Sequence, residues 1–361
     1  MTVKKTLLLL LPVAAAVLIF AAPSSAQRKK VFIDQDIGGA TGTDNQSVLM
    51  LLQAPDVEVL GVSIVSGDGW AKASTQYALR MFELTGHGHI PVAQGAVFTL
   101  INSREETLAW EEKYGEFAYK GAWNPRRYHD PDEVPPLPPG MPGIKPVSQH
   151  GVNLMIETLR KYPGEVILWC GGPLTNVAMA LRLDPELPRI AKELVLMGAG
   201  FNVDKGGNHR INGRREFNWW WDPEAVRIVM SAPWNKITIT PVDISVKTNL
   251  SEAIRSEIAK SDSPTARYLT EYSRPGGGGY MWDEISAGFL IDPSIITDQI
   301  ELYVNVDIDH GAGYGQTIFI EKEVKAPSWF WKVATVQKDL DLDRFYRLYV
   351  DLMSRGAKGT P

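Results

Sequence analysis

The sequence predicts an α/β fold, in which a single domain has a mostly parallel central sheet flanked by helices. The first observation is a repeated order of apolar strand, Gly-rich polar loop and helix along the chain. The second is that no low-complexity linker and no internal repeat divides the sequence. The third is size, because 361 residues with 44% hydrophobic content can form one large core.

Short apolar segments mark the predicted strands, and apolar residues at helical spacing mark the helices between them. Because each strand is followed by a helix, neighbouring strands are expected to run parallel, with helices on both faces of the sheet. The predicted strands cover residues 31–33, 57–65, 90–92, 165–170, 194–197 and 237–241, and the predicted helices cover residues 44–52, 71–85, 152–162, 177–183 and 342–353.

Three aspartates gather around the first predicted loop. Asp34 and Asp36 end the first strand, and Asp44 is the N-cap of the next helix or lies in its first turn. Ligands of open parallel sheets bind at the carboxyl ends of the strands. Carboxylates there repel one another unless a cation lies between them, and such hard ligands favour Ca²⁺ or Mg²⁺ over Zn²⁺. The alternative is a solvated acidic loop with Asp44 as an ordinary helix cap.

Residues 99–146 interrupt the alternation of strands and helices. They contain eight prolines together with Trp110, Trp123 and several tyrosines. This many prolines exclude one continuous helix or a central strand. Long irregular segments inside a domain are often functional, so we interpret residues 99–146 as a surface excursion or as a lid over a pocket.

The first 26 residues resemble a secretory signal peptide. Lys4 and Lys5 precede an apolar run over residues 7–20, and small residues end at Ala26, where we expect cleavage. The alternative, an uncleaved membrane anchor, is disfavoured because the run is shorter than the ~20 residues of a membrane span. The sequence thus predicts residues 27–361 as the mature domain, secreted or periplasmic, with no stable membrane anchor.

The charge and cysteine content exclude other classes. The net charge of −5 gives no basic surface for nucleic acid. Cys170 is the single cysteine, so no disulfide can form within the chain.

Several motifs, separated along the chain, occur together in one enzyme family. After the acidic segment 34–44 come Gly-Pro-Leu-Thr-Asn at 172–176, Glu-Phe-Asn at 216–218, Asp-Pro-Glu-Ala at 222–225, and Asp283 before the small residues 286–288. In this order they resemble the nucleoside hydrolases of the inosine–uridine-preferring type. The resemblance covers about residues 30–355.

The resemblance implies a nucleoside hydrolase-like fold, a bound Ca²⁺, and hydrolysis of the N-glycosidic bond of ribonucleosides to ribose and free base. It also implies a small-molecule nucleoside as partner, and a homo-oligomer. Asp36 would be a metal ligand and the base that activates the attacking water, near an oxocarbenium-like transition state. The other implied ligands are Asp44, Asp283 and the backbone carbonyl of Thr175 for the metal, and Glu216 and Asn218 for the ribose hydroxyls.

The loop between Asp36 and Asp44 is longer than the family pattern, so two alignments are possible. In the alignment that we prefer, the family's paired aspartates correspond to Thr43 and Asp44, and Thr43 replaces the residue that touches the sugar. In the other alignment they correspond to Asp44 and Asn45, and a neutral amide would weaken the metal site.

Two further positions differ from the pattern. Trp282 stands where the family often has a histidine that protonates the leaving base; tryptophan cannot donate in that way but can stack on a purine. The acid would then be Asp68 or solvent, or stacking alone would activate the base. Asn208 and Asn212 are both candidates for one further sugar contact.

Three alternatives compete with this interpretation. The first is an exported ligand-binding protein with two similar lobes. The second is a member of the family that binds the sugar or nucleoside without catalysis. The third is a phosphatase of the haloacid-dehalogenase type, since Asp34 and Asp36 also end a strand there. Trp219, Trp220 and Trp221 could line a base pocket, but core packing is expected for at least two of them.

Overall fold

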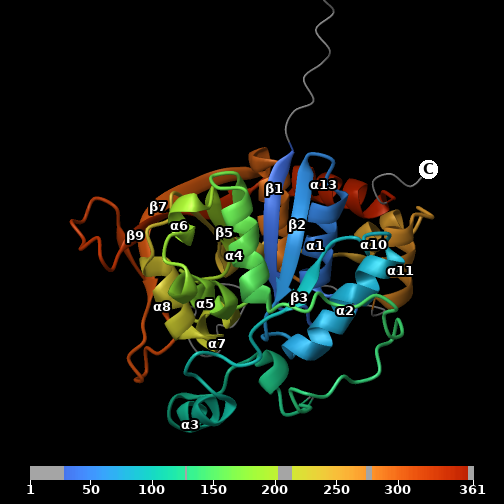
Figure 1. The fold of residues 1–361 in the computed structure, drawn as a ribbon. Coiled ribbons are helices and arrows are strands. Elements are labelled where there is room, and N and C mark those ends of the chain that lie inside the picture. The colour runs from blue at the N-terminus through green and yellow to red at the C-terminus, as the bar shows by residue number, and fades with distance from the viewer. Residues whose placement is uncertain (1–27, 127, 202–213, 274–278, 357–361) are drawn as a thin grey trace, which may run out of the picture.

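The computed structural model describes residues 28–126, 128–201, 214–273 and 279–356. The predicted signal peptide and both candidate asparagines, Asn208 and Asn212, lie outside the described residues. Figure 1 shows a central sheet covered by helices on both sides, as the sequence predicts.

Nine strands form one sheet in the order β3-β2-β1-β4-β5-β6-β9-β7-β8. The pairs from β3 to β6 and the pair β6–β9 are parallel, whereas β7 runs antiparallel to β8 and β9. The strands are β1 (Lys29–Gln35), β2 (Val57–Ile64), β3 (Val92–Gln94), β4 (Val166–Cys170), β5 (Glu193–Met197), β6 (Ile237–Thr240), β7 (Ile296–Val306), β8 (Thr317–Glu321) and β9 (Lys332–Leu340).

The strand order reverses direction between β1 and β4. From β1 the chain continues outward through β2 and β3, and then returns to place β4 on the other side of β1. Such a switch point opens a crevice outside the carboxyl ends of the two strands. The chain topology therefore assigns this edge to ligand binding before any side chain is considered.

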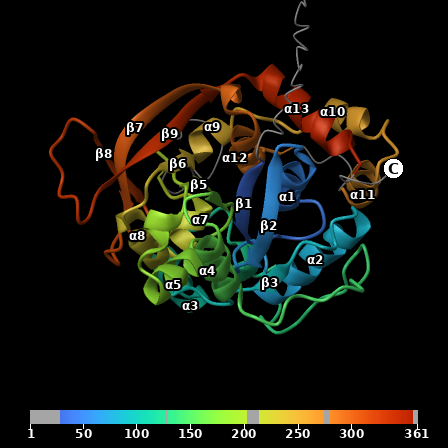
Figure 2. The same cartoon turned by 45° about the horizontal axis from the view of Figure 1, so that its top comes forward.

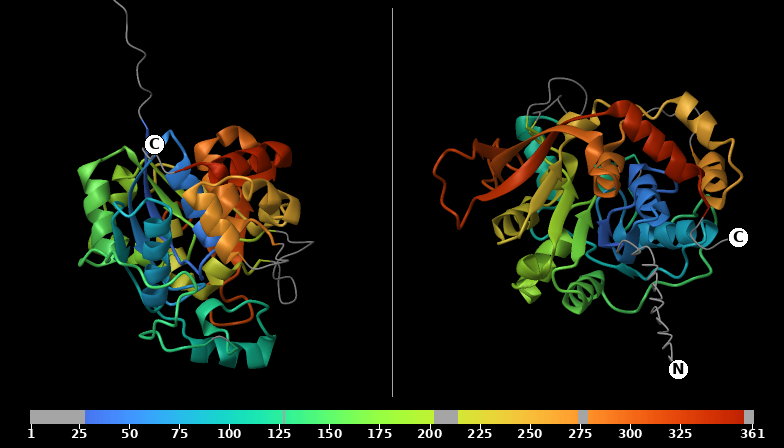
Figure 3. Two further views of the ribbon diagram at one scale, coloured as in Figure 1. Left: turned by 90° about the vertical axis from the view of Figure 1, so that its right-hand side faces the viewer. Right: turned by 90° about the horizontal axis from the view of Figure 1, so that it is seen from above.

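Helices cover both faces of the sheet, as the two views of Figure 3 show. One face packs under α1, α2 and α9 to α13, and the other under α4, α5, α6 and α8. The α-helices are α1 (Thr43–Gln53), α2 (Ala71–Leu84), α3 (Arg104–Tyr114), α4 (Gly151–Lys161), α5 (Thr175–Leu183), α6 (Leu187–Ile190), α7 (Phe217–Trp221), α8 (Pro223–Ser231), α9 (Val242–Ser245), α10 (Glu252–Ile258), α11 (Pro264–Tyr272), α12 (Trp282–Ile291) and α13 (Leu342–Ser354), and short 3₁₀ turns follow at Gly121–Trp123 and Pro293–Ile295.

Strand β1 shows why the two faces are both apolar. Val31 and Ile33 point into the core under α1 and α12, and Phe32 points into the core under α4. Successive side chains of a strand face opposite sides, so a strand covered on both faces reads as a continuous apolar run. This is the pattern from which the strand was predicted.

A third cluster, the aromatic cluster, connects the Pro-rich segment to α7. Its buried rings include Trp110, Phe117 and Trp123 from residues 99–146, and Trp220 and Trp221 from α7. Phe117 stacks on Trp220 with ring centroids 4.1 Å apart, and Trp123 stacks on Trp221 at 3.7 Å. The segment lies at the carboxyl edge of the parallel strands, below the sheet in Figure 1.

Several parts of the fold were not predicted, among them α3, the short helices α6 and α9 to α11, and the strands β7 to β9. Residues 99–146 contain α3, which begins after the N-cap Ser103 and ends before the first proline, Pro125. The antiparallel strands β7, β8 and β9 carry many exposed residues and lack a long apolar run, so their sequence gives little strand signal; they extend to one side of the sheet in Figure 2. Within the described ranges, each helix is too short or too polar to cross a membrane.

Candidate active site

A cavity of about 410 Å³ lies at the carboxyl edge of the sheet, beside the switch point. Asp36 reaches it just after β1, and Gly171 reaches it just after β4. The remaining lining residues come from loops and helix starts at the same edge: Thr43, Asp44, Asp68, Tyr119, Met197, Arg215, Glu216, Phe217, Asn218, Val242, Tyr280, Trp282 and Asp283.

Asp36 is held between loops that have no room for side chains. Its Oδ2 accepts a hydrogen bond of 2.7 Å from the backbone N–H of Asp68. A Cβ on Gly172 would lie 2.8 Å from Asp36 Oδ1, and a Cβ on Gly67 would overlap the carboxylate. Glycine at both positions lets the two strand-exit loops close around Asp36.

Asp44 and Asp283 both lie in the first turn of a helix, α1 and α12 respectively. The N-cap of α1 is Gly42, so of the two predicted positions for Asp44 the structure has the second. Asp44 Oδ2 accepts a hydrogen bond of 2.7 Å from Gly38 N–H, and Asp283 Oδ2 accepts one of 2.9 Å from Gln35 Nε2. Negative charge is favourable at helix N-termini, where backbone N–H groups point outward.

The acidic groups of the cavity raise one another's pKa. Burial raises the pKa of Asp36, Asp44, Asp68 and Asp283, and for Asp36, Asp68 and Asp283 the charges of neighbouring carboxylates raise it further. The Asp44 and Asp283 carboxyls are close enough to influence each other's pKa. Two carboxyls this close require a shared proton or a cation, which is the electrostatic condition predicted from the sequence.

The donor set is suited to a hard cation, although its side chains do not form a closed cage. Among the residues that the structure describes, no three histidine, cysteine, aspartate or glutamate side chains are placed so that they could hold a metal ion together. The lining residues include the carboxylates of Asp36, Asp44, Asp68, Glu216 and Asp283, and carboxylate oxygens are donors that Ca²⁺ prefers. Three of the carboxylates already accept one hydrogen bond that fixes their orientation. The chemistry of these residues thus suits an oxygen-liganded cation, although the side chains as placed do not form a closed site.

Thr175 does not line the cavity. It is the first residue of α5, it is buried, and its hydroxyl donates a 2.7 Å hydrogen bond to Asp222. The same loop reaches the cavity four residues earlier, at Gly171. Asn218 Nδ2 donates a 2.7 Å hydrogen bond to the carbonyl of Gly171, which fixes this carbonyl beside Asn218 at the cavity wall. The role expected of the Thr175 backbone carbonyl stays a prediction.

Glu216 and Asn218 are brought to the cavity by the start of α7. Glu216 is the N-cap, and its carboxylate accepts hydrogen bonds from the N–H groups of Asn218 at 2.9 Å and of Trp219 and Ala199 at 3.2 Å. Burial raises the pKa of Glu216 from its ordinary value of 4.5 to about 7. The cap thus fixes an acidic group at the cavity wall.

Aromatic side chains form another part of the wall. Phe217, Tyr119, Tyr280 and Trp282 line it, and Tyr280 packs edge-on against Trp282 with centroids 5.0 Å apart. All three tryptophans of α7 are buried outside the cavity, as expected for core packing. Neither Phe217 nor Tyr119 was singled out from the sequence, because an aromatic residue beside others gives no signal of which ring faces a cavity.

The structure favours the preferred alignment at the start of α1. Thr43 and Asp44 line the cavity. Asn45 is fully buried elsewhere, where its side chain accepts a hydrogen bond from Gly42 N–H and contacts the sulfur of Met81. The alternative alignment, with Asn45 as a ligand, would need this side chain to leave its packed position.

Comparison with known proteins identifies the family of this chain. Residues 31–347 match the family described as inosine-uridine preferring nucleoside hydrolase. The chain belongs to this family. It is thus a hydrolase that acts on N-glycosyl bonds, as the motifs predict, and neither the ligand-binding protein nor the phosphatase alternative is supported.

Relatives of this hydrolase are distant in sequence. A probable uridine nucleosidase of Arabidopsis thaliana is 30% identical over 67% of this chain and 68% of its own length. The inosine-uridine preferring nucleoside hydrolase of Leishmania major is 25% identical over 91% of this chain and 98% of its own. The structure of a plant nucleoside hydrolase has a TM-score of 0.71 at 22% identity, covering 90% of this chain and 99% of that one. The fold is therefore that of the nucleoside hydrolases.

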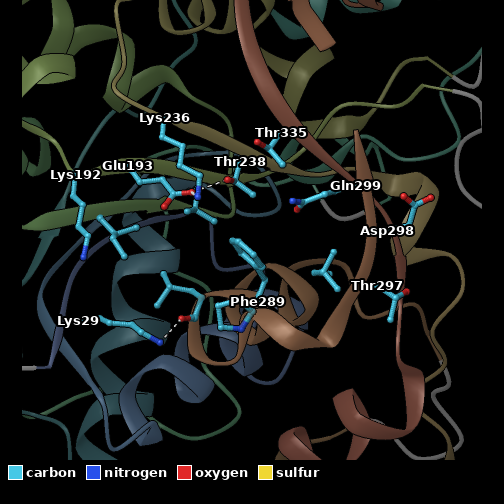
Figure 4. Close-up of a pocket in the computed structure, with 15 residues that line it drawn as sticks. Lys29, Lys192, Glu193, Lys236, Thr238, Phe289, Thr297, Asp298, Gln299 and Thr335 are labelled. Carbon is cyan, nitrogen blue, oxygen red and sulfur yellow. Dashed lines mark hydrogen bonds and ion pairs between the residues drawn. The ribbon is translucent and has the colours of Figure 1, made fainter. Parts of the chain in front are cut away.

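The hydrolase has a larger cavity, of about 640 Å³, at the opposite edge of the sheet (Figure 4). It is lined by residues at the amino ends of strands, including Lys29, Glu193 and Lys236. Lys29 donates to two backbone carbonyls of α12, and Lys236 forms an ion pair of 2.9 Å with Glu193. These charges are paired with protein groups, so this cavity lacks the convergent acidic groups of the first.

We expect Gly172→Ala to displace Asp36, because the added methyl group would lie 2.8 Å from its Oδ1. A shift of about 1 Å in a reacting group can lower activity about 100-fold. We therefore expect kcat for nucleoside hydrolysis to fall about 10- to 100-fold. Steady-state kinetics measure it. Gly311→Ala is the control, since no atom lies within 4 Å of its added Cβ. Equal kcat in both variants would contradict the packing described.

We expect Glu216 to make stability depend on pH in metal-free protein. Its pKa is about 7 in the fold against 4.5 ordinarily, so between these values the folded protein retains a proton that the unfolded chain has lost. The stabilisation is complete below pH 4.5 and is lost as the pH rises through 7. Urea unfolding should show wild type losing about 3 kcal/mol more than Glu216→Gln over this window. Parallel pH profiles would contradict the raised pKa.

Proposed function

We propose that this protein hydrolyses the N-glycosidic bond of ribonucleosides in a calcium-dependent reaction, releasing ribose and the free base. The observation that carries the proposal is the buried group of like-charged carboxylates at the switch point of the sheet, Asp36, Asp44 and Asp283. A cation among them would relieve their repulsion. Family membership, and relatives named as uridine nucleosidases and inosine–uridine hydrolases, support the reaction type.

The three carboxylates and the carbonyl of Gly171 are the proposed protein ligands of Ca²⁺. When bound there, Ca²⁺ supplies attachment for the ribose hydroxyls and lowers the pKa of a water molecule. The Thr175 side chain binds Asp222 away from the cavity, and the part expected of its backbone carbonyl stays a prediction.

Asp36 is the proposed general base. The backbone N–H of Asp68 holds its Oδ2, so the carboxylate is fixed at the cavity and can accept a proton from the attacking water. The water oxygen adds to the anomeric carbon, the C–N bond breaks, and its electron pair leaves with the base. The leaving nitrogen takes its proton from solvent, and Trp282, which lines the cavity, is the proposed stacking partner of the base.

The sugar side of the site is formed by Glu216 and Asn218. The capping hydrogen bonds of Glu216 and the bond from Asn218 to the Gly171 carbonyl fix both side chains before substrate arrives. Preorganised hydrogen-bonding groups of this kind lower the entropy cost of orienting the sugar. The cavity of about 410 Å³ is of the size expected for a small ligand.

We further propose that the protein is exported, supported by the basic start, apolar run and small residues before Gln27. N-terminal sequencing of protein recovered from the periplasm or the medium should begin at Gln27. Recovery from the cytoplasm with Met1 retained would contradict export.

Calorimetric titration of Ca²⁺ into chelator-treated protein tests the calcium site. We expect saturable binding in wild type, lost in Asp36→Asn, which keeps the size of the side chain but removes its charge. The matched control is Asp309→Ala at an exposed position. Release of free base from a panel of purine and pyrimidine nucleosides, with and without Ca²⁺, then tests the reaction and gives the base preference.

Each result separates the parts of the proposal. Binding that is lost in Asp36→Asn, together with calcium-dependent base release, supports it. Calcium binding without turnover on any nucleoside would contradict hydrolysis. Turnover that persists in chelator would contradict the calcium requirement and leave the hydrolase assignment intact.

A further inference from the structure

The hydroxyl of Thr43, expected at the sugar, is already engaged within the protein. It donates a 2.5 Å hydrogen bond to Glu284 Oε2 and accepts one of 3.1 Å from Asp283 N–H. A hydroxyl has a single proton to donate and two lone pairs. Thr43 thus serves to join α1 to α12 and keeps only one lone pair for a ligand, so a charged acceptor for a ribose hydroxyl has to come from another residue.

Asp68 is the carboxylate placed to do this. It follows β2, lines the cavity, and its charge interacts with those of Asp44 and Glu216, so it lies between the proposed metal ligands and the sugar side. Its backbone is fixed by the hydrogen bond to Asp36, and its Cβ packs against the Gly38 backbone, where an added Cβ would be 2.7 Å away.

Tyr119 holds the other end of this side chain. Its hydroxyl lies close enough to the Asp68 carboxylate to influence the pKa of both groups, and its ring packs edge-on against Phe217 with centroids 5.0 Å apart. Both Tyr119 and Phe217 line the cavity. A tyrosine hydroxyl that donates to one carboxylate oxygen leaves the second oxygen able to accept from a ligand.

The residues around Tyr119 are firmly anchored to the site. Ala122 N–H donates a 2.8 Å hydrogen bond to the carbonyl of Gly67, directly before Asp68. Gly121 has φ of +48°, and a Cβ there would lie 2.5 Å from the Phe217 ring, so this turn requires glycine. The stacked rings of the aromatic cluster, Phe117 on Trp220 and Trp123 on Trp221, hold the chain on both sides of Tyr119.

We propose that Tyr119 is a positioning residue, which orients the Asp68 carboxylate to accept a hydrogen bond from one of the two vicinal hydroxyls of the ribose. The inference rests on the proposed function. Through Tyr119, residues 99–146 would then help the protein to discriminate between ribonucleosides and deoxynucleosides.

The test compares kcat/KM for uridine with that for 2′-deoxyuridine and 3′-deoxyuridine. We expect Tyr119→Phe, which keeps the ring but loses the hydroxyl, to lower kcat/KM for uridine about 10-fold, mainly through KM. One deoxy substrate, lacking the hydroxyl concerned, should change less than twofold. Asp68→Asn should show the same pattern, and Tyr119→Phe should have no added effect in that background, because the residues act as one unit.

The matched control is Tyr128→Phe. Tyr128 belongs to the same segment, but its ring packs on Trp70 at 6.4 Å and it does not line the cavity. We expect its ratio of ribo to deoxy activity to stay within twofold of wild type. An equal loss on all three substrates in Tyr119→Phe, no loss at all, or an additive loss with Asp68→Asn would overturn the inference.

A failure of the proposed function can be told apart from a failure of this inference about Tyr119. If wild type releases no base but binds nucleosides, dissociation constants measured by calorimetry for the same substrates and variants replace kcat/KM, with the same expected pattern. If wild type neither hydrolyses nor binds any of the three nucleosides, the proposed function is overturned and the inference with it.

Discussion

Repulsion among buried carboxylates is the constraint on which the rest of the site depends. Asp36, Asp44, Asp68 and Asp283 share one cavity, and burial raises the pKa of each. A fold tolerates such a group only where backbone N–H groups, helix N-termini or a cation compensate the charge. Here the first two are supplied by the loops after β1 and β2 and by the starts of α1 and α12, which leaves a shared proton or a cation as the remaining compensation.

The aromatic cluster gives the Pro-rich segment a structural role at this site. Its rings stack on Trp220 and Trp221, and these follow directly on Glu216 and Asn218 in the chain. Packing of the segment therefore stabilises the same short helix that presents the sugar-side residues. Because prolines restrict the backbone of the unfolded chain, a segment rich in them loses less entropy when it is ordered in this way.

The parallel half of the fold and the acidic cluster could be predicted from sequence because their signals are local. Strands buried on both faces are continuous apolar runs, and Asp36 and Asp44 flank a Gly-rich turn. The antiparallel strands β7 to β9 could not be predicted, since exposed positions interrupt their apolar residues. The presence of Gly171 in the cavity wall was also out of reach, because a glycine that contributes only backbone leaves no mark in the residue type.

By itself, the sequence determined that an acidic loop follows a buried strand in an α/β domain, because residue type and periodicity encode both. Only the tertiary structure decided which side chains meet there. Thr43 binds Glu284, and Tyr119 lines the same cavity as Asp68, across separations in sequence that no local pattern spans. The physical reason is that strand order and loop packing, not spacing along the chain, bring β1, β2, α7 and α12 to one edge of the sheet.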